Sequence, residues 1–257
     1  MRDDSSLSAD RRHPETSLAS TKTDSSRKST TKGRAGVAAR PRRAHRAARA
    51  VVHASDAART ALVEGKRNMP GANLAGADLS GLSLRGCNLR GADLTAADLS
   101  GAALVACDLR GARLVRARLA DARLLLCNLR GAELDGASLE DASWAACALT
   151  EAQLRRAGVR EGNFLAVSLA RADLERADLR ASNFLLCSLA EARLAGARAE
   201  GTSFVLSRLG AADFTRAKLT RARFVLTTLR GAVFERATGL SRASFRMVWS
   251  SPARTAA

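Results

Sequence analysis

A large apolar residue recurs at nearly every fifth position from Leu74 to Phe234. Of these 33 positions, 24 hold Leu and six hold Phe, and the exceptions are Trp144, Val159 and Ala199. Two residues before each of them is a second restricted position, which holds Ala in 21 cases and Cys in five. A repeat this regular has to be interpreted before any single motif, because it determines the architecture of the whole segment.

A period of five fits neither an α-helix nor a straight strand. On a helix, five residues advance by about 500°, so the leucines would be spread around the cylinder. On a straight strand, an odd period sends successive leucines to opposite faces. A chain that bends once every five residues instead turns both restricted positions inward in each repeat. Four bends close a square coil of twenty residues, and such coils would stack about 4.8 Å apart, the spacing of hydrogen-bonded strands.

Residues twenty apart test this interpretation, because they should share one environment. All five cysteines keep this spacing, and a column of phenylalanines does the same. They are Cys87, Cys107, Cys127, Cys147 and Cys187, and Phe164, Phe184, Phe204 and Phe224. The pattern therefore predicts an all-β fold, a quadrilateral parallel β-helix of about eight coils over residues 71–237.

Units such as GADLT, GANLA, CDLRG and RADLE resemble the pentapeptide-repeat family, whose motif is A(D/N)LXX. The resemblance implies that the solenoid is right-handed, a point that the spacing alone does not give. The resemblance also implies a role to consider, since some members of the family mimic duplex DNA and bind type II topoisomerases such as gyrase. The departures from the motif at Trp144, at Gly158–Val159 and at Ala199 are expected to distort their coils.

The segments that flank the repeat differ from it in composition. Residues 1–50 are rich in Ser, Thr and Arg and poor in large apolar side chains, so we expect a disordered basic tail. Residues 51–70 are expected to form a short helix, with apolar residues at helical spacing over 51–64, and an N-terminal cap. The repeat frame slips by one around Thr238–Gly239, so we expect the coils to end there and residues 238–257 to form a C-terminal cap and tail.

The repeat lacks the residues that most catalytic and metal sites need. The chain has three histidines, His13, His45 and His53, and none of them lies in the repeat. No C-x-x-C pair is present, so zinc-ligand spacing is absent. We therefore expect no enzyme activity, no metal and no cofactor. The cysteines are interpreted as small buried thiols, which is typical of a reducing compartment and favours a cytoplasmic location.

Asp or Asn often directly precedes the core Leu, and such pairs of carboxylates could in principle serve as acids and bases. We interpret them instead as bend residues whose side chains accept hydrogen bonds from nearby backbone amides. They are Asn73, Asp78, Asn88, Asp93, Asp98, Asp108, Asp173 and Asp178.

Two neighbouring outward columns are apolar, and we call them the apolar stripe. It consists of Val105, Leu125, Leu126, Leu165, Leu185, Leu186, Val205, Leu206, Val225 and Leu226. A contiguous apolar surface of this kind usually marks an interface. Two alternatives remain open at this stage: the helix within residues 51–64 folds over the stripe, or the bends turn these side chains partly inward.

Two further columns form a basic stripe. One holds Arg90, Arg110, Arg130 and Arg230, and the other holds Arg116, Arg156, Arg176, Arg216 and Arg236. Asp121, Asp141 and Glu161 lie close by, so a solvated face of mixed charge is favoured over a phosphate or acidic-partner site. Of the formal net charge of +17, +9 lies in residues 1–69. Weak nucleic-acid binding is therefore assigned to the basic tail, which has no aromatic residues for base stacking.

The hypothesis that fits these features best is a non-enzymatic scaffold that binds a protein through a flat face of the solenoid. The sequence does not identify the partner, and a homodimer is one arrangement that fits. A gyrase-binding DNA mimic is an alternative, but it needs a strongly acidic surface, whereas residues 70–237 carry a net +5. A second alternative is an effector exported without a signal peptide through an unfolded N-terminal leader. No stretch approaches the roughly 18 uncharged apolar residues of a membrane span.

Overall fold

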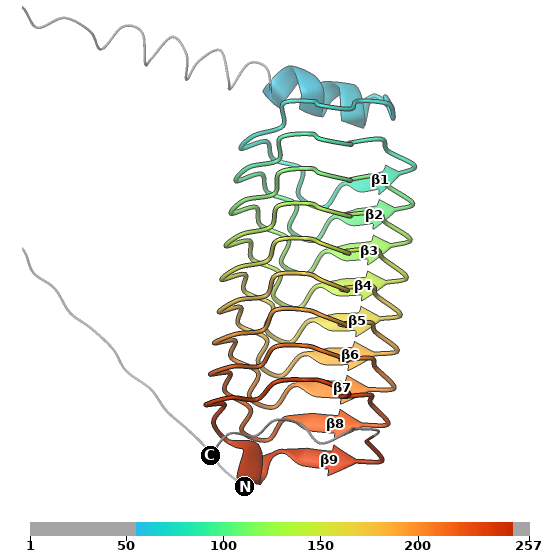
Figure 1. Cartoon of the computed structure of the whole chain (residues 1–257). Helices are drawn as coiled ribbons and strands as arrows, with labels where there is room; N and C mark the ends of the chain where they lie inside the picture. The colour runs from blue at the N-terminus through green and yellow to red at the C-terminus, as the bar shows by residue number, and fades with distance from the viewer. Residues whose placement is uncertain (1–54, 249–257) are drawn as a thin grey trace, which may run out of the picture. The chain divides into compact units, whose positions relative to one another are not determined.

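The computed structural model describes residues 55–248. The tail predicted over residues 1–50 lies outside the described residues, as does Trp249. The described chain forms a single nine-stranded parallel sheet in the order β1 to β9, with the remaining sides of each coil built from turns and isolated bridges (Figure 1). The strands are β1 (Ser83–Arg85), β2 (Ala103–Val105), β3 (Arg123–Leu125), β4 (Ser143–Ala145), β5 (Asn163–Leu165), β6 (Asn183–Leu185), β7 (Ser203–Val205), β8 (Arg223–Val225) and β9 (Ser244–Arg246).

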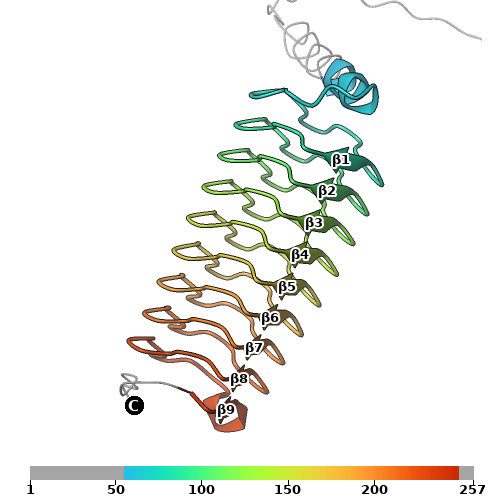
Figure 2. The same ribbon diagram turned by 90° about the vertical axis from the view of Figure 1, so that its right-hand side faces the viewer.

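The twenty-residue coil is confirmed by the pairing register. From β1 to β8, each residue pairs with the residue twenty positions later, as Leu84 does with Leu104. The other three sides of each coil keep the same offset through single bridges, for example between Asn73 and Asp93. Seen from the side, the coils stack as separate, nearly parallel layers with the strands in one row (Figure 2).

The corners of the coil have one shared backbone conformation. Every fifth residue from Gly71 to Arg236 has a positive φ, and Gly occupies 12 of these 34 positions. At three of the four corners, the N–H three residues after the large core residue donates back to its carbonyl, as from Ala92 to Leu89 (3.0 Å). The left-handed conformation turns the chain, and Gly adopts it without steric cost.

The interior contains the two restricted columns that the sequence marks. The large residues from Leu74 to Phe234 and the Ala and Cys residues two positions earlier are almost all buried. The phenylalanines stack along the axis, with ring centroids 4.7 Å apart for Phe164 and Phe184 and 5.1 Å apart for Phe184 and Phe204. The narrow Ala column leaves room for one large side chain per side, so the two columns together fill the coil.

The assignment of Asp and Asn to bends is confirmed. Oδ1 of Asp98 accepts a hydrogen bond from the Ser100 N–H at 2.9 Å, and Asp78 accepts one from the Ser80 N–H at 3.1 Å. The equivalent bond forms at all eight predicted residues. These side chains serve the local backbone, as expected for bend residues.

The expectation of distorted coils is wrong. Trp144 lies in register between Leu124 and Phe164 and is buried. Val159 and Ala199 are buried too, and both donate regular backbone hydrogen bonds to the next coil, at 2.8 Å each. The backbone ladder does not depend on side-chain volume, so the coil keeps its path. The cost at Trp144 is a buried Nε1 without a hydrogen-bond partner.

The expected end of the coils near residue 238 is also wrong, because the sheet continues for one more strand. Gly239 has a positive φ of 79°, and the short 3-10 helix η1 (Leu240–Arg242) follows it. These residues absorb the one-residue slip, and β9 then pairs with β8 at an offset of 21, with Phe245 opposite Phe224. The slip therefore shifts the register and does not stop the pairing.

Residues 55–63 form a helix at the N-terminal end of the solenoid (Figure 1). Leu62 is buried against the first coils, and Nε of Arg59 donates to the carbonyl of Asp78 at 2.5 Å. This helix therefore covers the apolar end of the stack.

Candidate functional site

The outer face of the sheet carries the apolar stripe. The first and third residues of each strand face outward, and the corner residue that follows adds a third side chain, although Ser203 in β7 is buried. Over the nine strands of the described chain, these 27 positions include four arginines and no Asp or Glu. The arginines are Arg85, Arg123, Arg223 and Arg246. Over β4 to β7 this face therefore carries no charged side chain, and the arginines lie on the strands to either side.

The stripe is open to solvent. The exposed fraction is 59% for Leu126, 53% for Leu186 and 47% for Leu206, and Leu125, Leu165 and Leu185 are exposed as well. Val105, Val205, Val225 and Leu226 are half-buried. The helix of residues 55–63 lies at the N-terminal end, so it does not cover these side chains (Figure 1).

Four leucines of the stripe occupy the left-handed corners. The φ angles are 56° at Leu126, 58° at Leu186, 50° at Leu206 and 53° at Leu226. A side chain with a Cβ in this conformation costs about 1–2 kcal/mol. Residues other than Gly occupy most of the corners, so what sets these leucines apart is a large apolar side chain that is largely exposed.

A hollow of about 410 Å³ interrupts the stripe at β4. Leu125 and Leu165 border it, Ala145 lies between them, and Arg123 and Asn163 also line it. It exists because Ala replaces the larger residue that the neighbouring strands carry in this column. Its mixed lining suits an apolar side chain next to a hydrogen-bonding group.

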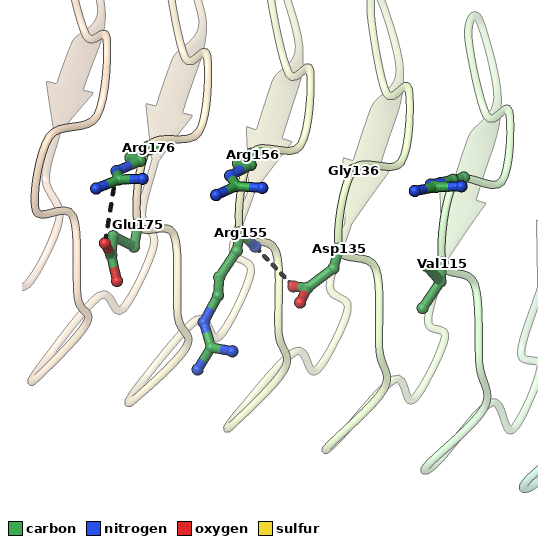
Figure 3. A pocket seen from close by; sticks show the side chains of 8 residues that line it. Val115, Asp135, Gly136, Arg155, Arg156, Glu175 and Arg176 are labelled. Atoms are coloured by element: carbon green, nitrogen blue, oxygen red, sulfur yellow. Dashed lines mark hydrogen bonds and ion pairs between the residues drawn. The ribbon is translucent and has the colours of Figure 1, made fainter.

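The corner column of the basic stripe lines a second hollow, of about 620 Å³ (Figure 3). Here acidic residues lie between the arginines: Asp135 accepts a hydrogen bond from the Arg155 N–H at 2.9 Å, and Glu175 is 3.7 Å from Arg176. Nε of Arg155 also pairs with Asp173 at 2.8 Å. Arg116 and Arg156 form no ion pair with any described residue.

The other column of the basic stripe is similar. Arg110 pairs with Asp108 at 2.5 Å, and Arg130 pairs with Glu151 at 3.3 Å. A side-chain hydrogen bond from Arg110 lowers the pKa of Asp108. Exposed pairs of this kind contribute little to stability, but they neutralise the arginines locally. Three arginines of the predicted basic stripe, Arg110, Arg130 and Arg176, are thus paired with carboxylates, and the other six form no ion pair with a described residue.

The thiols of Cys87 and Cys187 offer little reactivity. All five cysteines are free and buried. Burial raises the pKa of Cys87 and of Cys187 to about 11, so both thiols are neutral near pH 7 and are poor nucleophiles. Residues 55–248 contain no group of three His, Cys, Asp or Glu side chains that could hold a metal ion. Within the same residues, no helix combines the length and apolar character needed to cross a bilayer.

The left-handed conformation of the corner column was not predicted from the sequence. The signal was present, because the glycines of the repeat fall in this column from Gly71 to Gly231 with few exceptions. This column of glycines predicts a left-handed conformation for every residue in it, including the corner leucines of the apolar stripe.

Solved structures with the same repeat are similar to this chain. HetL, a pentapeptide repeat protein involved in heterocyst differentiation regulation from the cyanobacterium Nostoc sp. strain PCC 7120, is 25% identical. The match covers 74% of this chain and 90% of that chain, with a TM-score of 0.40. A trypsin-treated form of QnrB1, a plasmid-mediated fluoroquinolone resistance protein, is 21% identical over 72% of this chain and 86% of that chain, with a TM-score of 0.41. None of the curated proteins compared with this chain matches it significantly.

The sequence profile described as pentapeptide repeats matches in eight copies, over residues 72–111, 112–143 and, in overlapping segments, 147–246. These residues are those of the described solenoid and make up more than half of the chain. The chain belongs to the pentapeptide repeat family.

Proposed function

We propose that this protein is a non-enzymatic scaffold that binds a protein partner through the apolar stripe on the outer face of β2 to β8. The observation that carries the proposal is the exposure of large leucines at left-handed corners, as at Leu126, Leu186 and Leu206. These side chains contribute little to the core and occupy a strained conformation. Partner binding gives them a role, because it would remove their apolar surface from water.

The energetics of such an interface are favourable. Fully burying a Leu side chain contributes about 1.5–3 kcal/mol, and six leucines of the stripe are exposed. The backbone that presents them is hydrogen-bonded from coil to coil, so little ordering is needed on binding. The hollow beside Ala145 gives the surface relief into which one anchoring side chain would fit.

The double variant Leu186→Glu with Leu206→Glu tests this function. Both side chains are exposed, so the variant should fold while losing self-association or the capture of its partner. Sedimentation velocity would measure the first, and quantitative mass spectrometry of co-purified proteins would measure the second. The matched control is Ala96→Glu with Ala211→Glu, which adds the same charge at exposed left-handed corners on other sides of the coil. If the stripe variant and the control behave like the wild type in both measurements, the stripe is not an interface.

The gyrase-binding alternative has no support from the described surface. Residues 55–248 carry 28 basic and 20 acidic side chains, whereas a mimic of duplex DNA needs a strongly acidic surface. The scaffold is therefore the one function that we propose.

A further inference from the structure

Charge is distributed unevenly along the described chain. Residues 55–205 hold 19 basic and 18 acidic residues, whereas residues 206–248 hold nine basic and two acidic residues. We call the nine the basic collar: Arg208, Arg216, Lys218, Arg221, Arg223, Arg230, Arg236, Arg242 and Arg246. Most of the solenoid is thus nearly neutral, and its C-terminal end carries a net +7.

The ion pairs also separate the basic collar from the rest of the solenoid. Every ion pair between described residues joins partners within the segment from Asp93 to Arg198. None of the nine collar residues has a carboxylate of the described chain within 4.0 Å, and all nine are exposed.

One column shows how the change arises. Asp178, Arg198 and Lys218 occupy the same position in successive coils, where their backbones form parallel β-bridges. Arg198 lies 3.7 Å from Asp178, but Lys218 follows Arg198 and has no carboxylate beside it.

Five collar residues lie on adjacent sides of the last coils. Arg216 and Arg236 occupy the same corner column in adjacent coils, where the Arg216 N–H donates to the Glu235 carbonyl at 2.8 Å. Lys218 lies two residues beyond Arg216, on the next side of the coil.

Arg221 and Arg223 complete this group at the corner that leads into β8, and the buried Ala222 lies between them. Of the two acidic residues nearby, Asp213 accepts a hydrogen bond from the Thr215 N–H at 2.8 Å. Neither Asp213 nor Glu235 forms an ion pair with a described residue.

We propose that the basic collar binds the phosphate backbone of duplex nucleic acid. Eight of the nine residues are Arg, whose planar guanidinium binds a phosphate through two hydrogen bonds. Collar arginines can meet a phosphate without giving up an ion pair, unlike Arg113, Arg193 and Arg198 upstream. The binding gains free energy from counterion release at the nucleic acid.

The surface favours a duplex over other anionic partners. Single-strand binding uses aromatic side chains on which bases stack, and Phe245 is the one exposed aromatic residue between residues 55 and 248. Protein interfaces usually combine both signs of charge with an apolar centre, whereas residues 206–248 carry nine basic and only two acidic side chains. A second copy docked on this end would bring nine cations against nine.

Fluorescence anisotropy with a labelled 20-base-pair DNA duplex of mixed sequence tests the proposal on the full chain. The collar variant combines Arg216→Gln, Arg221→Gln, Arg223→Gln and Arg236→Gln. The control combines Arg113→Gln, Arg118→Gln, Arg193→Gln and Arg198→Gln, so it changes the net charge by the same amount. The collar variant should bind at least tenfold more weakly at about 100 mM salt, and its slope of log K against log salt should be smaller by about 3. The control should stay within about twofold of the wild type.

The smaller variant Arg216→Gln with Arg236→Gln should give about half of the change in slope, and circular dichroism confirms that each variant is folded. Equal losses in the collar variant and the control would overturn the proposal, because total charge would then explain binding. An unchanged collar variant would overturn it as well, since binding would then lie elsewhere, as in residues 1–54. Displacement of the duplex by poly-glutamate at equal charge concentration would indicate an acidic protein as the partner instead.

Discussion

The thiol of Cys107 donates a hydrogen bond to the carbonyl oxygen of Leu84, one coil earlier, across 3.4 Å. Cys127 bonds to Leu104 in the same way at 3.4 Å, and the hydroxyl of Ser207 donates to the Phe184 carbonyl at 3.1 Å. This corner follows the strand in each described coil, and it lacks the turn hydrogen bond that closes the other three. A small side chain fits there, and Cys or Ser can also donate to the previous coil, whereas Val167 has no donor and the Thr227 hydroxyl has no partner.

The first prediction concerns this column. Cys127→Ser should change the free energy of unfolding by less than about 1 kcal/mol, because Ser207 already makes the equivalent bond. Cys127→Leu should destabilise the solenoid by about 1–3 kcal/mol, because the narrow interior has no room for a larger side chain. Chemical denaturation of both variants measures the difference. Equal stability of the two would show that the column does not select for size.

The second prediction concerns the aromatic stack. Phe204 lies between Phe184 and Phe224, with ring centroids 5.1 and 5.2 Å away. Phe204→Ala should cost about 3–5 kcal/mol through the cavity that it leaves. Phe204→Leu should cost less than about 1.5 kcal/mol, since Leu occupies the same column at Leu84 and Leu104. Thermal unfolding of both variants checks this order, and a reversed order would contradict the packing described.

The third prediction separates the two roles of the corner leucines. The triple variant Leu126→Gly, Leu186→Gly and Leu206→Gly relieves strain at three left-handed corners, while Gly adds a smaller entropic cost. The thermal midpoint should therefore stay the same or rise, while partner binding should be lost. The control Ala146→Gly with Ala166→Gly changes the same column without removing a leucine and should keep binding. A large loss of stability in the triple variant would show that these leucines serve the fold.

The fourth prediction concerns acid. The neighbouring Ser100 hydroxyl and the Ser100 N–H that donates to Oδ1 lower the pKa of Asp98, and side-chain and backbone hydrogen bonds from Ser80 lower the pKa of Asp78. The folded state therefore favours the ionised form of both side chains more than the unfolded state does. Their contribution to stability is complete above the unfolded pKa of about 3.9 and is lost as the pH falls through the lower folded pKa.

The thermal midpoint should consequently fall between about pH 4 and pH 2. The double variant Asp78→Asn with Asp98→Asn should flatten this profile, because Asn keeps an oxygen acceptor and does not titrate in this range. The control Asp121→Asn with Asp141→Asn alters exposed carboxylates that accept no hydrogen bond from a described residue. A control that flattens the profile equally would rule out the bend carboxylates as the specific cause.

The sequence by itself determined the coil, its two inward columns and the role of Asp and Asn at the bends. These features are local, because each follows from where five consecutive residues point and which backbone amide lies two residues ahead. The same reasoning predicted the columns twenty residues apart, including the cysteines and the phenylalanines, since a closed coil has to repeat.

Only the tertiary structure decided which side chains meet across the coils. It showed that Trp144 fits without distortion, because the ladder depends on backbone groups alone. It showed that β9 continues the sheet after a one-residue slip, because Gly239 and η1 absorb the extra residue. It also separated the paired arginines from the basic collar, because ion pairing depends on which carboxylate lies beside each arginine, in most cases one coil away.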